Sequence, residues 1–270
     1  MASYLVTGVS RGLGLAFLRQ LSRDPTLTVI GLVRDKAKAE EVLESELKRD
    51  NVKLVQGDLS DYASLAGAVK ETSNITGGKL DYLIENAGLL PELSALTSMD
   101  KLAGQPEDLE KDLLESFRVN VVGNIHLVNL CLPLLRRSKV RKVAAITTGM
   151  ADLDFLARHD AGLAGPYTIS KGALNVAMAK LSAQHRDERI LFLAVSPGVV
   201  ATAMPGNLSE EQQDGLRRLT QGVLAYAPDF SGPSSPEEAA RRVLSVVHDA
   251  KFEAGDSGSF VSQFGNRKWV

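Results

Sequence analysis

Short apolar runs alternate with longer amphipathic segments along the whole chain. The apolar runs cover residues 4–7, 28–33, 52–56, 82–85, 142–147 and 190–196, with a late run at 259–262. Most of them are almost continuously apolar, a pattern typical of β-strands that are covered on both faces. Apolar residues at helical spacing mark the segments between them, 13–23, 36–49, 65–72, 107–136, 168–186 and 236–249. This alternation predicts an α/β fold, a single doubly wound parallel β-sheet with helices on both faces.

Two helix starts are marked by capping residues. Ser235 precedes Pro236, with Glu238 three residues after the cap, a sequence that predicts the start of the last helix. Ser209 with Gln212 has the same spacing and predicts a short helix before it.

The irregular stretches decide the domain organisation. The chain has 270 residues, almost two domains at roughly 150 residues each, yet no linker-like change of composition divides it. Loops that follow parallel strands lie at the carboxyl edge of the sheet, where ligands bind. We therefore interpret 88–106 and the lid 203–235 as walls of a ligand site, with a plain surface loop as the alternative for 88–106. The prediction is one domain over 1–270.

Composition and charge exclude several classes of protein. Hydrophobic residues make up 44% and charged residues 24% of the chain, close to the globular average, which excludes disorder. Lys plus Arg total 31 against 33 Asp plus Glu, so a net charge of −2 offers no basic surface for nucleic acid or an anionic membrane. The chain starts without a basic leader and has no run of about 18 apolar residues, so we expect neither a targeting peptide nor a membrane span.

The single cysteine and the histidines show no pattern of their own. Cys131 lies in an apolar run and is expected to be a small buried side chain. One thiol cannot form an internal disulfide, which fits a reducing compartment. The four histidines lack metal-ligand spacing, so no metal site is predicted. A soluble cytoplasmic protein is the expectation.

A glycine-rich loop follows the first predicted strand directly and opens an amphipathic helix. It reads Thr7-Gly8-Val9-Ser10-Arg11-Gly12-Leu13-Gly14. Glycines allow a tight turn and a close approach to a pyrophosphate, and the helix N-terminus directs N–H groups at the anion. Because the loop lies within the first strand–helix unit, it indicates a dinucleotide-binding site.

The end of the second strand indicates which dinucleotide is bound. An acidic residue there would bind the ribose diol of NAD, but Val33 cannot, and Arg34 follows it. Arg11 is placed to reach the same position, and two guanidinium groups favour NADP(H) over NAD(H). We interpret Asp35 as the N-cap of the next helix. Asp58, after the third strand, is placed either to meet the adenine or to cap the helix that follows.

Tyr167 and Lys171 form the second chemical motif. They lie four residues apart at the start of a predicted helix, so their side chains share one helical face. A free phenol has a pKa of about 10 and is a poor acid–base group at neutral pH. A neighbouring ammonium, joined by the charged nicotinamide when the cofactor is oxidised, is expected to lower that pKa toward the working range.

Together these motifs resemble the short-chain dehydrogenase/reductase family over essentially the whole chain, in particular its carbonyl-reductase-like, fungal-type members. The matching residues beyond the two motifs are Asp58, Asn86-Ala87-Gly88, Asn120, the strand end 145–149, Ser196-Pro197-Gly198 with Thr202, and the ending 262–269. The resemblance implies a Rossmann fold and a catalytic tetrad of Asn120, Thr148, Tyr167 and Lys171.

The resemblance also assigns a role to each member of the tetrad. Tyr167 would be the general acid in ketone reduction, and Lys171 would lower its pKa and hold the nicotinamide ribose. Asn120 would anchor a water that relays protons to Lys171, although a plain polar helix residue is the alternative. Thr148 would hydrogen-bond the substrate oxygen, and the segment 197–202 would close over the nicotinamide. The expected cofactor-binding residues are Gly8, Ser10, Arg11, Gly12, Leu13, Gly14, Arg34, Asp58, Leu59, Asn86, Ala87, Gly88, Tyr167, Lys171, Pro197, Gly198, Val200 and Thr202.

Three positions depart from the family's pattern. The usual Ser-Ser pair is Thr147-Thr148, whose neighbouring side chains point to opposite faces. The family position selects Thr148; Thr147 and the loss of the donor stay as alternatives. Glu85 replaces the first residue of the family's Asn-Asn-Ala-Gly turn. Eighteen residues separate Thr148 from Tyr167, more than the family norm, so the loop 151–165 is expected to add a wall to the substrate pocket and to hinder tetramer packing.

The predicted function is NADPH-dependent reduction of a ketone or aldehyde, reversible as alcohol oxidation. The alternatives are a dinucleotide-binding sensor or regulatory protein, and a non-redox biosynthetic enzyme that performs dehydration or cyclisation on the same fold. The expected partner is a small-molecule carbonyl or alcohol substrate, with no nucleic acid and no membrane. A homodimer and a homotetramer both stay open.

Overall fold

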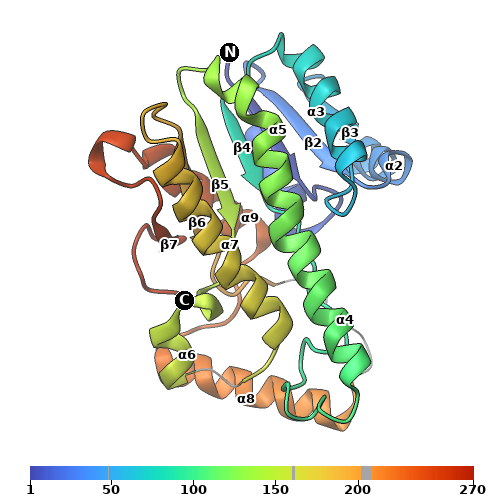
Figure 1. Ribbon diagram of the computed structural model, residues 1–270, viewed down its shortest axis with the longest axis vertical. Helices are drawn as coiled ribbons and strands as arrows, with labels where there is room; N and C mark the ends of the chain where they lie inside the picture. The colour runs from blue at the N-terminus through green and yellow to red at the C-terminus, as the bar shows by residue number, and fades with distance from the viewer. Residues whose placement is uncertain (48, 160–161, 202–207) are drawn as a thin grey trace.

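The fold is described from a computed structural model, for residues 1–47, 49–159, 162–201 and 208–270. Within this part of the chain, seven parallel strands form one sheet in the order β3-β2-β1-β4-β5-β6-β7 (Figure 1). The strands are β1 Ser3–Thr7, β2 Thr28–Val33, β3 Val52–Gln56, β4 Tyr82–Glu85, β5 Lys142–Ile146, β6 Leu191–Ser196 and β7 Phe260–Ser262. The predicted parallel sheet is confirmed, and each strand matches its predicted bounds to within one residue at one end.

The strand order reverses at β1, and this reversal positions the site. The chain builds outward from β1 through β2 and β3, then returns to the other side of β1 with β4. Connections that leave β1 and β4 in opposite directions open a crevice at the carboxyl ends of these strands. The glycine loop after β1 and the turn 86–88 after β4 therefore lie side by side.

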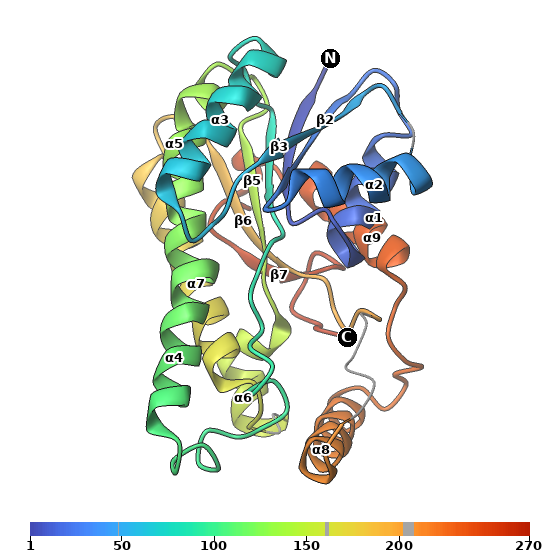
Figure 2. The same ribbon diagram turned by 90° about the vertical axis from the view of Figure 1, so that its right-hand side faces the viewer.

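Helices cover both faces of the sheet (Figure 2). One face carries α1 Gly12–Leu21, α2 Lys36–Glu46 and α9 Pro236–Asp249, and the other carries α3 Tyr62–Thr76, α5 Asn124–Arg136 and α7 Gly165–Gln184. Successive side chains of a strand point to opposite faces of the sheet, so alternate residues belong to two separate apolar clusters. Leu5 and Leu83 pack toward α3, α5 and α7, whereas Val6 and Ile84 pack toward α1 and α9. The doubly wound α/β prediction is confirmed.

The predicted continuous helix over 107–136 is wrong in one detail. The structure has α4 Pro106–Phe117, then a π-helical segment η1 Arg118–Gly123, then α5. Gly123 packs so closely on Leu59 that a Cβ there would lie 2.2 Å from the Leu59 carbonyl oxygen. The wider turn accommodates this contact and places Asn120 inward, and such turns occur often at functional sites.

The same helical stretch, Pro106–Arg136, is long and apolar enough to cross a membrane if only length and composition are considered. More than half of its most apolar window is buried inside the protein. This is weak evidence for a span, because the core helix of a globular fold passes the same test.

Helix starts follow their capping residues. The Ser209 hydroxyl and Gln212 form the predicted capping box of α8 Glu210–Tyr226, a helix longer than expected. Ser235 caps α9 by accepting from the Glu238 N–H, as predicted. The helix predicted over 65–72 starts earlier, because Asp61 caps α3 by accepting from two backbone N–H groups. The predicted loop 151–165 contains a helix of its own, α6 Leu153–His159.

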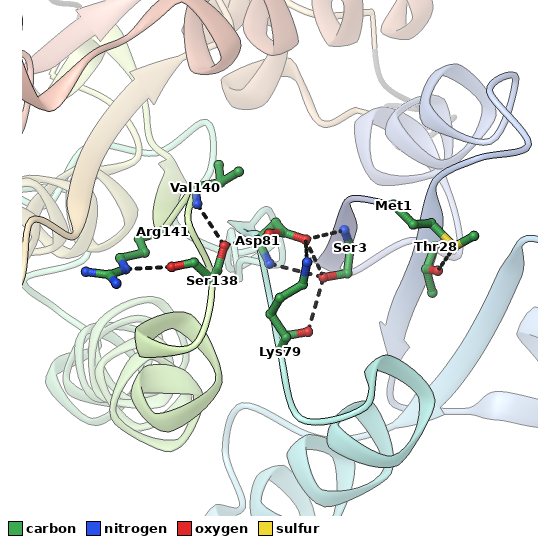
Figure 3. Close-up of polar contacts among 8 residues, drawn as sticks. All are labelled: Met1, Ser3, Thr28, Lys79, Asp81, Ser138, Val140 and Arg141. Atoms are coloured by element: carbon green, nitrogen blue, oxygen red, sulfur yellow. Dashed lines mark hydrogen bonds and ion pairs between the residues drawn. The ribbon is translucent and has the colours of Figure 1, made fainter.

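The amino edge of the sheet is joined by a buried carboxylate (Figure 3). Asp81, just before β4, accepts from the Ser3 N–H at 2.8 Å and from the Ser138 hydroxyl at 2.5 Å, and lies 3.5 Å from Lys79 Nζ. Burial would raise the pKa of Asp81, but these hydrogen bonds and the ammonium hold it below the ordinary value. One side chain thus ties the starts of β1, β4 and β5 together.

Candidate active site

The glycine loop after β1 fits a bound pyrophosphate. Gly8 and Gly12 have φ values of +70° and +56°, a conformation that favours glycine. A Cβ on Gly14 would lie 2.1 Å from the Gly8 carbonyl oxygen, so α1 can start this close to the strand only with glycine there. Arg11 precedes α1 and its side chain does not cap the helix, whose first-turn N–H groups can bind an anion.

Asn86 locks the glycine loop to the end of β4. Its Nδ2 donates to the carbonyl oxygens of Thr7 at 2.9 Å and Gly8 at 3.2 Å. In return, the Thr7 hydroxyl accepts from the N–H groups of Asn86 at 2.9 Å and Ala87 at 2.8 Å. A Cβ on Gly8 would meet Ala87 Cα at 2.9 Å. The two loops of the crevice thus form one rigid unit, and of the predicted cofactor residues Gly8, Gly14, Asn86 and Ala87 lie within it.

The end of the crevice where the adenosine is predicted to bind carries exposed cations. Arg34 follows the buried Val33 and is exposed, as are Ser10 and Arg11. Burial would raise the pKa of Asp58, but hydrogen bonds from Ser60 outweigh it, with help from the charge of Arg34.

The two carboxylates near this end have different roles. Asp35 caps α2 by accepting from the Lys38 N–H at 3.1 Å, as predicted. Asp58 accepts instead from the Ser60 N–H and hydroxyl at 2.8 and 2.7 Å, and α3 is capped by Asp61. Of the two roles open to Asp58, the capping role is therefore wrong.

The start of α7 places Tyr167 and Lys171. Ala164 adopts a left-handed conformation with φ 53° directly before the helix, and its N–H donates to the Ser94 carbonyl oxygen at 3.1 Å. A Cβ on Gly165 would lie 2.6 Å from Met99 Sδ, so the loop 88–106 presses on the first turn. The left-handed residue and the tight contact together fix where the first turn of α7 begins.

Lys171 is 3% exposed and reaches across to β5. Its Nζ donates to the Ile146 carbonyl oxygen at 2.7 Å and lies 5.9 Å from the centroid of the Tyr167 ring. Burial lowers the pKa of Lys171 to about 8, opposed by the charge of Glu85. Burial also raises the pKa of Tyr167 to about 12. In the protein without cofactor the pKa of Tyr167 is therefore raised by burial, and the lowering expected from Lys171 together with the oxidised nicotinamide stays a prediction.

Asn120 lies next to Lys171. Its Oδ1 accepts from the Leu89 N–H at 2.7 Å, and its Nδ2 donates to the Leu89 carbonyl at 2.8 Å and to the Ser170 hydroxyl at 2.9 Å. A Cβ on Gly88 would lie 3.2 Å from both Asn120 Oδ1 and Lys171 Nζ. Asn120 thus links η1, α7 and the turn after β4, and Gly88 leaves the space in which the amide and the ammonium approach.

The two threonines after β5 differ in exposure. Thr147 is buried, and its hydroxyl has no hydrogen-bond partner among the described residues. Thr148 is half-buried and caps the short 3₁₀ turn η2 Gly149–Ala151 by accepting from the Met150 N–H at 3.2 Å. Thr148 is therefore the more accessible hydroxyl, as expected for a group that binds substrate.

The C-terminal segment supports the site, a role that sequence reasoning missed. Trp269 is buried and stacks on Phe260, with ring centroids 4.4 Å apart. A Cβ on Gly149 would lie 2.6 Å from Trp269 Cβ, and one on Gly198 would lie 2.2 Å from Gln263 Nε2. The only signal in the sequence was the resemblance of the ending 262–269 to the family's. Of the predicted segment 197–202, Val200 bridges to Ser234, and Thr202 lies outside the described residues.

Three long segments meet beyond the carboxyl edge of the sheet (Figures 1 and 2). Tyr226 of α8 packs edge-on against Phe155 and His159 of α6, with ring centroids 5.1 and 5.2 Å apart. Lys101 of the loop 88–106 pairs with Glu211 of α8 at 2.9 Å. We call this assembly of 88–106, α6 and α8 the cap.

No metal cluster is found in the described ranges, where no three His, Cys, Asp or Glu side chains come together in a way that could hold an ion. Cys131 is buried in α5, and burial raises the pKa of its thiol.

Comparisons with known proteins agree with this arrangement. Residues 3–213 match the family model described as short chain dehydrogenase. The short chain dehydrogenase virK of Hypocrea virens is 47% identical, and the short-chain dehydrogenase/reductase iacC of Pestalotiopsis fici is 41% identical; each alignment covers 100% of both chains. An NADPH-bound carbonyl reductase from chicken fatty liver has the same fold, with a TM-score of 0.78 and 24% identity over 98% of each chain.

Proposed function

Because the chain belongs to the short-chain dehydrogenases, a family of oxidoreductases that use a nicotinamide dinucleotide, we propose that it reduces a ketone or aldehyde with NADPH. The observation that carries the proposal is the grouping of Asn120 and Lys171 at Gly88, beside the glycine loop, with Lys171 Nζ 5.9 Å from the centroid of the Tyr167 ring. The reverse reaction is oxidation of the corresponding alcohol.

The residues of the crevice suit the proposed cofactor. The Gly8–Gly14 loop and the first turn of α1 would hold the pyrophosphate, and Arg11 and Arg34 would hold the 2′-phosphate of NADPH. Val33 offers no acceptor for the diol of NADH. The chicken carbonyl reductase with the same fold was solved with NADPH. When bound, the nicotinamide supplies the hydride.

The side chains of this protein would control the proton. Tyr167 keeps its proton at neutral pH because burial raises its pKa to about 12. It can therefore donate that proton to a carbonyl oxygen as negative charge develops there. The Thr148 hydroxyl would donate a hydrogen bond to the same oxygen. The Lys171 ammonium would stabilise the phenolate left behind, and Asn120 would hold the turn 88–89 in place.

The structure of the cap is in keeping with the proposal that the substrate is a small molecule. Its three segments come from distant parts of the chain and cover the carboxyl edge, so substrate choice would depend on them. Three of their cations are paired with carboxylates, Lys101 with Glu211 and both Arg217 and Arg218 with Asp214, which argues against a site for a phosphorylated substrate.

A carbonyl panel tests the proposal. Oxidation of NADPH would be followed by absorbance in the presence of each compound. Mass spectrometry of the products would show whether the substrate has gained two hydrogens. We expect turnover with at least one ketone or aldehyde and weaker binding of NADH than of NADPH. Arg34→Ala should reduce the difference in binding affinity between NADPH and NADH. NADPH binding without any turnover would favour the sensor, and a product without the two-hydrogen gain would favour a non-redox reaction.

A further inference from the structure

A buried carboxyl group lies beneath the candidate site and has no part in the scheme above. Glu85 is the last residue of β4 and is 0% exposed. Neither of its carboxylate oxygens has a hydrogen-bond partner among the described residues. A carboxylate without donors is costly to bury, so a group of this kind requires a reason for being there.

The position of Glu85 directs its charge toward Lys171. Glu85 follows Leu83 by two residues, so its side chain projects to the same face, toward α5 and α7. In the sheet it pairs with Ala145, next to Ile146, whose carbonyl receives Lys171 Nζ. Three residues further on, a Cβ added to Gly88 would lie 3.2 Å from Lys171 Nζ, so the turn that begins at Glu85 passes close to the ammonium. The register and the turn thus bring Glu85 and the Lys171 ammonium to the same end of β4 and β5.

Among the described residues, two ionisable groups interact electrostatically with Glu85, one from α7 and one from α5. The Lys171 ammonium on α7 lowers the pKa of Glu85, but burial dominates and raises it well above the ordinary value. The Cys131 thiol on α5 is buried, and both burial and the charge of Glu85 raise its pKa, so it stays neutral. Lys171 is therefore the one charged partner among these groups.

A buried acid and a buried amine of this kind titrate as a pair. After the pair gives up one proton, two forms are possible: a carboxylate with an ammonium, or a neutral acid with a neutral amine. The charged form is favoured, because opposite charges attract strongly where solvation is poor. The proton then leaves Glu85, and the carboxylate that remains keeps the ammonium charged. A lone Lys171 would lose its proton at lower pH.

We propose that Glu85 is a positioning residue that keeps Lys171 protonated over the working pH range. It acts through Lys171 and does not touch substrate. This inference rests on the proposed function, because it assumes that the Lys171 ammonium supports proton donation by Tyr167.

The pH profile of Glu85→Gln tests the inference. The substitution keeps shape and removes the ionisable group. For carbonyl reduction, the alkaline fall of kcat/KM should start about one pH unit lower than in the wild type, with little change near pH 6. Glu110→Gln, which removes an exposed carboxylate on α4, is the matched control and should follow the wild-type profile. An unchanged alkaline limb in Glu85→Gln would overturn the proposal.

Thermal unfolding gives a readout that does not need activity. Glu85 has a higher pKa folded than unfolded, so the folded state binds more protons above about pH 4.5 and the protein loses stability as pH rises. The Tm of Glu85→Gln, relative to the wild type, should therefore increase between pH 5 and pH 8. If the wild type reduces no carbonyl compound, the proposed function fails. A Tm difference that grows with pH then still supports the buried, titrating carboxyl on which the inference rests, and a constant difference overturns it.

Discussion

Burial acts on the two central side chains in opposite directions. It raises the pKa of Tyr167 to about 12 and lowers that of Lys171 to about 8, because in each case it disfavours the charged form. At neutral pH the phenol holds its proton, while the ammonium is close to losing its own. Carbonyl reduction needs both protonated, so we expect the reaction to be supported below about pH 8 and lost above it.

Tyr167→Phe removes the proton donor and leaves the ring in place. We expect carbonyl reduction to fall by roughly 100-fold or more, the size of a general-acid contribution. The dissociation constant of NADPH should stay within a few-fold of the wild type, because the glycine loop and Lys171 are intact. Steady-state kinetics measure the turnover, and fluorescence titration measures the dissociation constant of NADPH. Undiminished turnover would remove Tyr167 from its role.

A site residue could be predicted from the sequence where residues close to it in the chain mark its role. Tyr167 and Lys171 share a helical face by spacing alone, so the sequence shows the pair. Asn120 was selected by resemblance, and its bonds to Leu89 and Ser170 depend on the fold. Glu85 was visible as a departure from the family's turn, but its burial was not.

At the scale of elements, the C-terminal segment and the π-helical turn have the largest effect on the site. The apolar pattern of 107–136 predicts one helix, and nothing in it marks the wider turn at Arg118–Gly123. The wider turn coincides with a tertiary contact, that of Gly123 with Leu59. Trp269 packs in the same way against Gly149, directly after the Thr148 hydroxyl.

Trp269→Ala should leave a cavity under the turn that carries Thr148. Loss of a buried aromatic ring costs about 3 kcal/mol of unfolding free energy. Loosening of the turn should lower kcat/KM by roughly 10-fold or more, because catalysis is sensitive to small misplacement. Chemical denaturation and kinetics measure both. Lys268→Ala, at an exposed neighbour, is the control, and equal effects of the two variants would contradict a role for the indole ring.

At the scale of the whole molecule, the two edges of the sheet are built for different purposes. The carboxyl edge gathers glycine turns, buried ionisable groups and the cap. The amino edge is closed by Asp81, whose hydrogen bonds to Ser3 and Ser138 join three strands (Figure 3). The first arrangement favours binding and chemistry, and the second favours stability.

Asp81→Asn should destabilise the protein by about 2 kcal/mol at pH 7, because a buried charge-assisted acceptor is lost. The folded pKa of Asp81 lies below its ordinary value of 3.8, so the carboxylate stabilises the fold above that value. The Tm gap between variant and wild type should close as pH falls through the folded pKa. Asp50→Asn, at an exposed position, should show no gap. A gap independent of pH would contradict the role of the charge.

The sequence by itself determined the parallel sheet, most of its helices, the glycine loop and the Tyr167/Lys171 pair. These depend on local periodicity and on residue types at short spacing, which the order of residues records directly. Only the tertiary structure decided the burial of Glu85, the support of Gly149 by Trp269 and the meeting of three distant segments in the cap. These contacts join residues far apart in the chain, and burial by distant neighbours sets their energies and pKa values, which no local pattern contains.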